Sequence, residues 1–365
     1  MSDSTVDEKS KLNPQDMSAR VARRALNSAL NVPDDWAKRL FGEPAKNDRG
    51  QPMDRQTYLL LNLMDMGSTE GLHEQDPEMA RSIYRHGNRI MQMDPVDLYE
   101  VRDVEVPGDE GPLNARWYQP VEEPRPTALY LHGGGFVIGD VEGYDSLCRY
   151  IAREANICIL SLDYRLAPEN PFPAGPKDCI AAFRYLIDET PTLGGDDSTM
   201  MVMGDSAGAT LSTVISQAQI DDGRRRPDHQ FLLYPTTDLF HESPSRIYFH
   251  AGYVLEEPTL KWFGEAYLLN SDGEISQEHP WISPIFYDRM EEMPPTTLIT
   301  AGFDPLRDEG KAFADALQEA GVDVDYHCYE HLIHGFANMG GLVDAAKEAV
   351  DEICQMIDAV VGGDH

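Results

Sequence analysis

The chain has 365 residues and a formal net charge of −33, from 63 acidic and 30 basic residues. This length is enough for one large buried core with appended segments, whereas the acidic balance excludes nucleic acid as a partner, because phosphate binding needs a basic face. Only eight of the basic residues are Lys, so the surface fits either adaptation to salt, where counter-ions screen the self-repulsion, or an ordinary acidic cytosolic protein.

The first part of the chain shows no sign of export or membrane insertion. Residues 1–16 are polar and charged, without the apolar core of a signal peptide. The longest apolar run near them, 58–61, is far too short to span a bilayer. Five scattered cysteines, without a Cys-x-x-Cys pair, argue against a disulfide framework and against a zinc site. We therefore expect a cytoplasmic protein with no membrane partner.

Residues 1–97 are predicted to form an N-terminal extension and cap helices. A polar tail over residues 1–12 is expected to be disordered. Apolar residues at helical spacing then predict four helices, which begin at Asn13-Pro14 and Pro33, cover about 58–66, and follow Pro77. Their apolar faces carry no chemical motif, so we interpret them as packing surfaces of a core or a lid.

From Leu98 onward, short strands alternate with helices. An antiparallel hairpin is predicted over 101–118. The later predicted strands are 128–131, 157–162, 200–203, 231–234, 296–300 and 322–329. This alternation indicates an α/β fold, with a mostly parallel, doubly wound sheet covered on both faces. We assign 98–235 and 293–365 to the catalytic domain, and 236–292, which interrupts the alternation, to a cap insertion.

The apolar run at 200–203 is followed by a candidate nucleophile. It ends in Gly204-Asp205-Ser206-Ala207-Gly208, and a helical pattern begins at once. Gly-x-Ser-x-Gly between a strand and a helix is the sequence of a nucleophile turn, so tight that the positions two before and two after the serine must be nearly free of side chain. The turn exposes the Ser206 hydroxyl above the helix N-terminus. Most single matches to this pattern are ordinary loops, so the prediction needs support from elsewhere in the chain.

The loop His132-Gly133-Gly134-Gly135-Phe136 follows the strand predicted at 128–131. Sites in such a sheet form at the carboxyl ends of the strands. Three successive glycines let backbone N–H groups converge on one point, which is what an oxyanion needs. A flexible turn or a phosphate cradle is the alternative interpretation, but no Gly-Lys-Ser/Thr follows, which excludes a P-loop.

Two carboxylates follow the strand predicted at 296–300. Asp304 lies in the loop just past the strand. Asp308 falls in the first turn of the next helix, where a carboxylate is usually a helix-end residue. Asp304 is therefore the candidate catalytic acid.

Two histidines follow the last predicted strand. His334, next to Gly335, has the room to reach Ser206, whereas we expect His331 to be structural. A serine, then an acid, then a histidine is the chain order of the α/β-hydrolases. Three weak signals in this order, each at a strand end, support one another.

With these motifs in place, the sequence resembles the hormone-sensitive-lipase-like esterases of the α/β-hydrolase fold. The similarity runs from about Val101 to the end of the chain, and more loosely from about Pro52. The motifs that carry it are His132-Gly133-Gly134-Gly135, Asp163-Tyr164-Arg165-Leu166-Ala167-Pro168-Glu169, Phe172-Pro173-Ala174, Gly204-Asp205-Ser206-Ala207-Gly208, Asp304-Pro305-Leu306-Arg307-Asp308-Glu309-Gly310 and His334-Gly335-Phe336.

The resemblance implies an α/β-hydrolase fold with a cap and assigns the catalytic roles. Ser206 is the nucleophile, His334 the base, and Asp304 the acid that orients it. The oxyanion hole consists of three backbone N–H groups, those of Gly134, Gly135 and Ala207. Residues 163–174 correspond to a structural block of ion pairs and turns that supports the site.

The chain departs from the family pattern at three places. Ala209 stands where another glycine is frequent, which should not alter the chemistry. Tyr144-Asp145 replaces a frequent His-Asp pair, which leaves substrate contacts there undefined. The first fifty or so residues have no counterpart in the common bacterial members, and they could add to the lid or to a dimer contact.

We therefore expect a serine carboxylesterase that hydrolyses short-chain acyl esters of small molecules, with no metal and no organic cofactor. An amidase or a lactonase would use the same groups, and a non-catalytic receptor on this fold would be expected to lack one of them. The lid would consist of the N-terminal helices and the 236–292 insertion. Its bulky aromatic residues, which would shorten an acyl pocket, are Trp262, Phe263, Tyr267 and Trp281. A homodimer is expected by family resemblance, with a contribution from the apolar face over 17–41.

Overall fold

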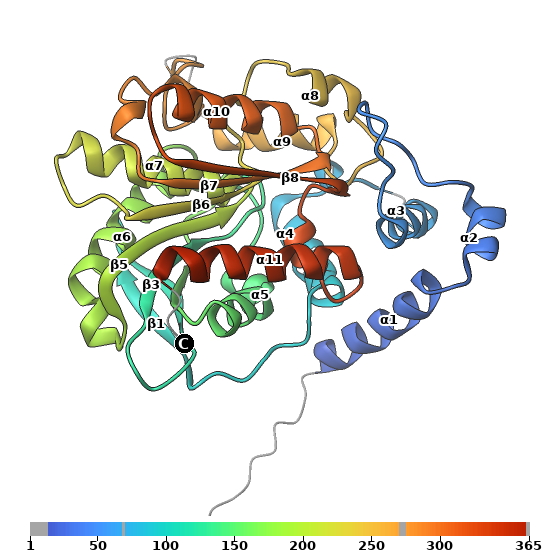
Figure 1. Ribbon diagram of the computed structural model, residues 1–365, viewed down its shortest axis with the longest axis horizontal. Coiled ribbons are helices and arrows are strands. Elements are labelled where there is room, and N and C mark those ends of the chain that lie inside the picture. The colour runs from blue at the N-terminus through green and yellow to red at the C-terminus, as the bar shows by residue number, and fades with distance from the viewer. Residues whose placement is uncertain (1–13, 68–69, 270–274, 363–365) are drawn as a thin grey trace, which may run out of the picture.

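The computed structural model describes residues 14–67, 70–269 and 275–362, so the tail predicted over residues 1–12 and the cap position of Asn13 lie outside the described residues. Within them, eight strands form one sheet in the order β1-β2-β4-β3-β5-β6-β7-β8 (Figure 1). The strands are β1 Glu100–Pro107, β2 Pro112–Gln119, β3 Pro126–Leu131, β4 Cys158–Leu162, β5 Asp196–Asp205, β6 His229–Leu233, β7 Thr296–Phe303 and β8 Val324–Ile333. Pairing is antiparallel from β1 to β2 and from β2 to β4, and parallel elsewhere. The prediction of a mostly parallel sheet is confirmed, and the predicted hairpin, β1 and β2, lies at one edge of it.

Helices cover both faces of this sheet. The side chains of β5 show why: Met201 and Met203 pack into the apolar cluster shared with α5 and α11, whereas Val202 points into the cluster shared with α6 and α7. A third cluster packs α10 against β6 and β7 on the same side as α7. The covering helices are α5 Val141–Glu154, α6 Ala174–Leu193, α7 Ala207–Asp221, α10 Arg307–Glu319 and α11 Asp344–Val361. Because the central strands are buried on both faces, their sequences are continuous apolar runs.

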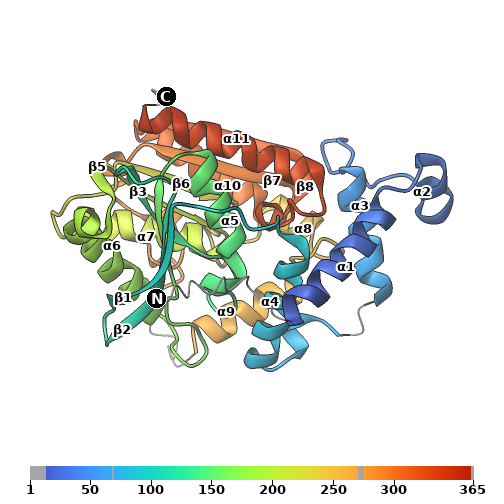
Figure 2. The ribbon, with the colours of Figure 1, turned by 90° about the horizontal axis from the view of Figure 1, so that it is seen from below.

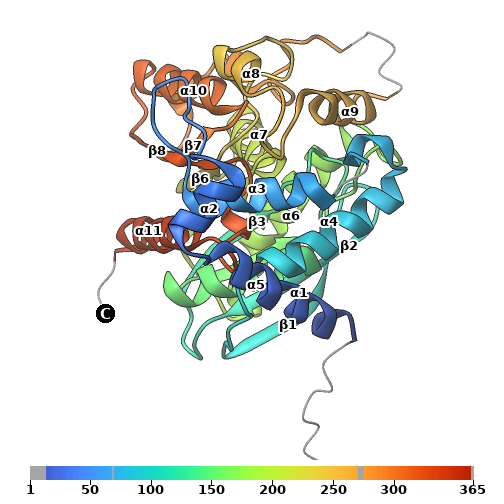
Figure 3. The ribbon, with the colours of Figure 1, turned by 90° about the vertical axis from the view of Figure 1, so that its right-hand side faces the viewer.

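The N-terminal helices lie near the carboxyl ends of the strands (Figures 2 and 3). They are α1 Pro14–Leu30, α2 Asp34–Phe41, α3 Arg55–Gly67 and α4 Pro77–Met91, with the short helix η1 Leu72–Glu74 before α4. The sequence explains the start of α4, because the Asp76 side chain accepts a hydrogen bond from the Met79 N–H and Pro77 occupies the first turn. The predicted helices after Pro14, Pro33 and Pro77 are present.

The 236–292 segment carries the remaining cap elements. These are α8 Pro244–Tyr248, α9 Glu257–Tyr267 and the short helices η2 Pro284–Phe286 and η3 Met290–Glu292. α9 packs against η1, so this segment and the N-terminal extension meet over the sheet, and α8 packs against α10. The division into an extension, a catalytic domain and a cap insertion stays a prediction.

The end of β8 and the place of His331 differ from the sequence prediction. β8 was expected to end at Tyr329 but continues to Ile333, because it carries a bulge: Ala301 pairs with Tyr329, whereas Phe303, only two residues later, pairs with Ile333. His331 therefore lies within a strand and not in a loop. No helix in the described part of the chain has the length and apolar character needed to cross a bilayer.

Candidate active site

Ser206 lies on a sharp turn between β5 and α7. Its backbone, with φ 53° and ψ −123°, is strained for a residue that has a side chain, and its N–H donates to the Leu233 carbonyl oxygen at 2.8 Å. A Cβ atom on Gly208 would lie 1.9 Å from the Leu131 carbonyl oxygen, and one on Gly204 would lie 2.5 Å from the same atom. Both glycines of the motif are therefore required because the turn presses against the end of β3.

His334 contacts both Ser206 and Asp304. Its Nε2 lies 3.0 Å from Ser206 Oγ, and its Nδ1 lies 2.8 Å from Asp304 Oδ2. Asp304 is completely buried, and its Oδ1 accepts a hydrogen bond from the Leu306 N–H at 2.8 Å, so its own turn orients the carboxylate. An ionised carboxylate can only accept, which places the imidazole proton on Nδ1 and leaves Nε2 free to accept from the serine hydroxyl. Gly335, with φ +77°, lets the chain turn directly after the histidine.

The competing acid and histidine lie elsewhere. Asp308 accepts hydrogen bonds from the Ser245 N–H and from Arg307 Nε at 2.9 and 2.8 Å, respectively, and has no bond to His334 among the described contacts. The side chain of His331 is exposed, and its backbone carbonyl oxygen accepts from the Asp54 N–H at 2.8 Å. The geometry therefore favours the pair that the sequence analysis chose.

The glycine loop lies beside the serine turn because β3 and β5 are paired, with Leu131 opposite Gly204. Gly134 and Gly135 have φ of +120° and +59°, a region that favours glycine. Ala207 is the first residue of α7, where N–H groups have no partner inside the helix. The three N–H groups predicted to bind an oxyanion thus belong to two adjacent turns at the carboxyl end of the sheet.

A buried carboxylate, which the sequence analysis did not single out, holds the glycine loop in place. Asp205, directly before Ser206, accepts hydrogen bonds from the Gly133 N–H at 2.9 Å and from the hydroxyls of Tyr130 and Tyr144 at 3.0 Å each. Burial raises the pKa of Asp205, and the three hydrogen bonds oppose that shift. The sequence offered one indication of this role, because Asp205 occupies the second position of the Gly-x-Ser-x-Gly motif.

The side chains of Tyr144 and Asp145 are held by contacts with other protein groups. Tyr144 is completely buried between Asp205 and the Tyr84 hydroxyl, which lies 2.9 Å from its own hydroxyl. Asp145 accepts hydrogen bonds from Arg116 and Arg149 at 2.9 and 2.6 Å. The tyrosine thus supports the glycine loop through Asp205.

The block at 163–174 has ion-pair and turn contacts, as interpreted from the sequence. Arg165 donates hydrogen bonds from Nε and Nη2 to the completely buried Asp178 carboxylate, at 2.7 and 2.9 Å. Asp163 accepts a hydrogen bond from the Val141 N–H at the start of α5. These contacts connect the block to α5 and α6. Two others connect it to the glycine loop: the Tyr164 hydroxyl donates to the His132 carbonyl oxygen at 2.7 Å, and the Ala167 N–H donates to the Phe136 carbonyl oxygen at 2.9 Å.

Aromatic side chains of α9 cover the glycine loop. A Cβ atom on Gly135 would lie 2.2 Å from the Phe263 ring, so this ring rests directly on the loop backbone. Tyr267 stacks on Phe136 with ring centroids 3.9 Å apart. Trp281 lines a hollow beside α6.

Metal ligands do not gather anywhere in the described ranges: among residues 14–67, 70–269 and 275–362, no three His, Cys, Asp or Glu residues lie close enough to hold an ion. All five cysteines are free thiols. The site itself consists of one hydroxyl, one imidazole, one carboxylate and backbone N–H groups, an arrangement that suits nucleophilic attack on a carbonyl carbon.

Comparison with known proteins places this geometry in context. A family model described as "alpha/beta hydrolase fold" matches residues 128–338. The chain is 35% identical over 319 residues to the carboxylic ester hydrolase LipN of Mycobacterium tuberculosis, covering 85% of this chain and 84% of the relative. It is also 30% identical over 300 residues to an ethyl acetate hydrolase of Pseudomonas putida, covering 80% of this chain and 93% of the relative.

The chain is also similar to solved structures of ester hydrolases. An ester hydrolase from the metagenome of Lake Arreo, complexed with a derivative of bipyridine phosphonate, superposes with a TM-score of 0.81 at 38% identity, over 85% of this chain and 99% of that one. An esterase of Pyrobaculum calidifontis superposes with a TM-score of 0.76 at 34% identity, over 82% and 97%.

Proposed function

Because this chain belongs to the α/β-hydrolase family, in its hormone-sensitive-lipase-like branch, and is a carboxylic ester hydrolase, we propose that Ser206, His334 and Asp304 are its catalytic triad. One observation carries the proposal: the two contacts of His334, 3.0 Å to Ser206 Oγ and 2.8 Å to Asp304 Oδ2, form a continuous row from nucleophile to acid. The acid end of this row is completely buried and the serine end is not, so only the hydroxyl is presented to a substrate.

Acylation begins when Ser206 Oγ attacks the ester carbonyl carbon and His334 Nε2 accepts the hydroxyl proton. Asp304 stabilises the imidazolium that forms. The tetrahedral intermediate collapses, the bond from carbon to the alcohol oxygen breaks, and His334 returns the proton to the leaving alcohol. Water then attacks the acyl-enzyme by the same route, and the carboxylic acid leaves.

The charge that develops on the carbonyl oxygen is stabilised by the N–H groups of Gly134, Gly135 and Ala207. The positive φ angles of both glycines and the helix start at Ala207 support this role. Donors fixed by the fold need no reorganisation during the reaction, and loss of one such donor typically costs about 100- to 1,000-fold in kcat.

The substrates are expected to be esters with short acyl chains. The Phe263 ring rests on Gly135, and the neighbouring stack of Tyr267 on Phe136 leaves bulky groups beside the oxyanion loop. Each added CH₂ contributes about 0.8 kcal/mol until a wall is reached, after which the sign reverses. A charge of −33 also disfavours an anionic lipid interface.

A panel of chromogenic esters from acetate to palmitate tests both proposals, with anilides and lactones as the alternative carbonyl classes. We expect kcat/KM to peak at short acyl chains, and Ser206→Ala to lower kcat by several orders of magnitude without loss of folding. Full activity of Ser206→Ala would exclude the triad. Turnover of emulsified long-chain triglyceride at or above the butyrate rate would exclude the short pocket, and preference for an anilide or a lactone would change the substrate class.

The expected cytoplasmic homodimer also belongs to this proposal. The free cysteines support a reducing compartment. In the 17–41 part of the extension, the large apolar side chains that are more than half exposed are Met17, Val21, Trp36 and Leu40. Light scattering should give twice the chain mass, and Trp36→Arg should weaken the dimer, whereas a monomer at assay concentrations would remove this proposal.

A further inference from the structure

The N-terminal extension reaches the active site through a small hairpin, which we call the N-terminal strap (residues 45–54). Lys46 pairs with Pro52, and a tight turn ending at Gly50, with φ +78°, closes the hairpin. Within the turn, the buried Asn47 accepts from the N–H groups of Arg49 and Gln51. The turn is thus rigid and presents its polar tip to the body of the protein.

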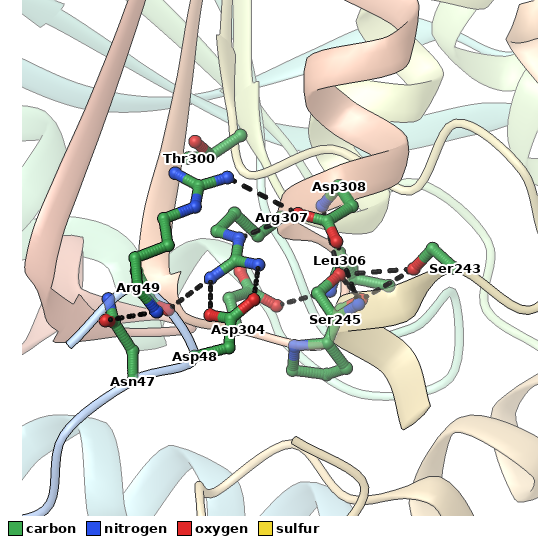
Figure 4. Close-up of polar contacts among 12 residues, drawn as sticks. Asn47, Asp48, Arg49, Ser243, Ser245, Thr300, Asp304, Leu306, Arg307 and Asp308 are labelled. Atoms are coloured by element: carbon green, nitrogen blue, oxygen red, sulfur yellow. Dashed lines mark hydrogen bonds and ion pairs between the residues drawn. The ribbon is translucent and has the colours of Figure 1, made fainter. Parts of the chain in front are cut away.

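One side of the tip holds the loop of the catalytic acid. The two carboxylate oxygens of Asp48 accept hydrogen bonds from Nη1 and Nη2 of Arg307 at 2.6 and 2.8 Å (Figure 4). Arg307 is 1% exposed. Nη1 of this guanidinium also donates to the Gly302 carbonyl oxygen, and the backbone N–H of Arg307 donates to the Asp304 carbonyl oxygen. Arg307 therefore spans the turn on which Asp304 lies, and Asp48 is the carboxylate that anchors it from outside.

The other side of the tip holds the bulge that precedes the catalytic histidine. The Glu330 carboxylate accepts hydrogen bonds from Arg49 Nη1 at 2.7 Å and from Asn47 Nδ2 at 3.1 Å. The strap also donates the Asp54 N–H to the His331 carbonyl oxygen. The bulge is pressed onto β7, because a Cβ atom on Gly302 would lie 2.1 Å from the Glu330 carbonyl oxygen. His334 follows Glu330 after the last three residues of β8, so the same hairpin holds the segments that carry Asp304 and His334.

We propose that the N-terminal strap is a positioning element of the active site, which sets the spacing of Asp304 and His334 through the Asp48–Arg307 pair and the Glu330 contacts. The inference rests on the proposed triad. A buried guanidinium that loses a bidentate carboxylate must find new partners, and here its movement is transmitted directly to the turn at Asp304. The strap touches neither the serine nor its oxyanion loop in the described contacts, so its effect is expected on kcat.

The test replaces Asp48 by Asn in the full-length protein and measures kcat per active site, titrated with an irreversible phosphonate. We expect kcat to fall about 10- to 100-fold, as for misplacement of catalytic groups by a fraction of an ångström to one ångström, with KM within about twofold. Asp48→Glu should recover part of the loss. The matched control is Asp34→Asn, which removes the carboxylate of the Asp34–Arg55 ion pair in the same extension and should leave kcat unchanged.

A second readout does not depend on turnover. The imidazole proton that bonds to a carboxylate has a far-downfield proton resonance, which should be present in the wild type and in Asp34→Asn, and displaced or broadened in Asp48→Asn. Glu330→Gln, which weakens the other half of the strap contact, should act in the same direction. An unchanged resonance together with an unchanged kcat per titrated site would overturn the proposal, even if the protein unfolded at lower urea. An ester-inactive wild type with a strap-dependent resonance would contradict the proposed function alone.

Discussion

Glu309 offers a prediction in which the structure determines both the sign and the size of a pH effect. It lies in the first turn of α10, and its Oε1 accepts from the N–H groups of Thr237 and Asp238 at 2.9 and 3.2 Å. Its Oε2 has no partner among the described residues. Burial raises the pKa of this carboxyl to about 8, while the two backbone N–H groups and Arg246 lower it and Asp238 raises it. Glu309 is therefore buried as the neutral acid at neutral pH.

The sign follows from proton counts. The unfolded chain ionises Glu309 near its ordinary value of 4.5, whereas the folded protein retains the proton up to about pH 8. Between these values the folded state binds more protons, so the free energy of unfolding falls as pH rises. At about 1.4 kcal/mol per pH unit, the penalty approaches about 5 kcal/mol above pH 8 and is constant from there.

Glu309→Gln removes this penalty because the amide keeps an acceptor for the two N–H groups and does not ionise. Urea unfolding from about pH 5 to about pH 9 should show the variant gaining stability relative to the wild type by about 1.4 kcal/mol per pH unit and then levelling off. The control is Glu319→Gln at the exposed end of the same helix, for which the difference should stay constant. A constant difference for Glu309→Gln would refute the reasoning.

Two further predictions concern the site and the surface. His334→Ala should lower kcat by several orders of magnitude and His331→Ala by less than about threefold, and Asp304→Asn should cost far more than Asp308→Asn; steady-state kinetics that rank either pair the other way would reassign the triad. The melting temperature should rise from low to molar NaCl, because a charge of −33 repels itself and counter-ions screen it; a flat or falling melting temperature would favour the ordinary acidic surface.

The parts of the molecule that sequence could predict are those where a local pattern has a local steric cause. The glycines around Ser206 follow from the closeness of the turn to β3, and both appear in the sequence as a motif. The mostly parallel sheet, and the place of the glycine loop after one of its strands, follow from the alternation of apolar runs and helices. For the same reason the choice between Asp304 and Asp308 could be argued from their places after a strand and in a helix.

The remaining features depend on contacts between distant parts of the chain. The bulge that extends β8 past Tyr329 is a relation between two strands and leaves no period in either sequence. The Asp48–Arg307 pair joins residues 259 apart, and nothing distinguishes Asp48 from its acidic neighbours in a chain with 63 acidic residues. Asp205 was visible in its motif, but its three partners come from β3, α5 and the glycine loop.

The strap also constrains when an active molecule can exist during synthesis. The strap must dock on residues that leave the ribosome much later, because its Asn47 and their Glu330 are 283 positions apart in the sequence. At about 5 to 20 residues per second, roughly 15 to 60 seconds separate the two. Contacts of such long range also slow folding. A nascent chain of this hydrolase therefore carries its serine turn long before it has the loops that the strap joins, and hydrolytic activity is expected only after residues 330–334 have left the ribosome.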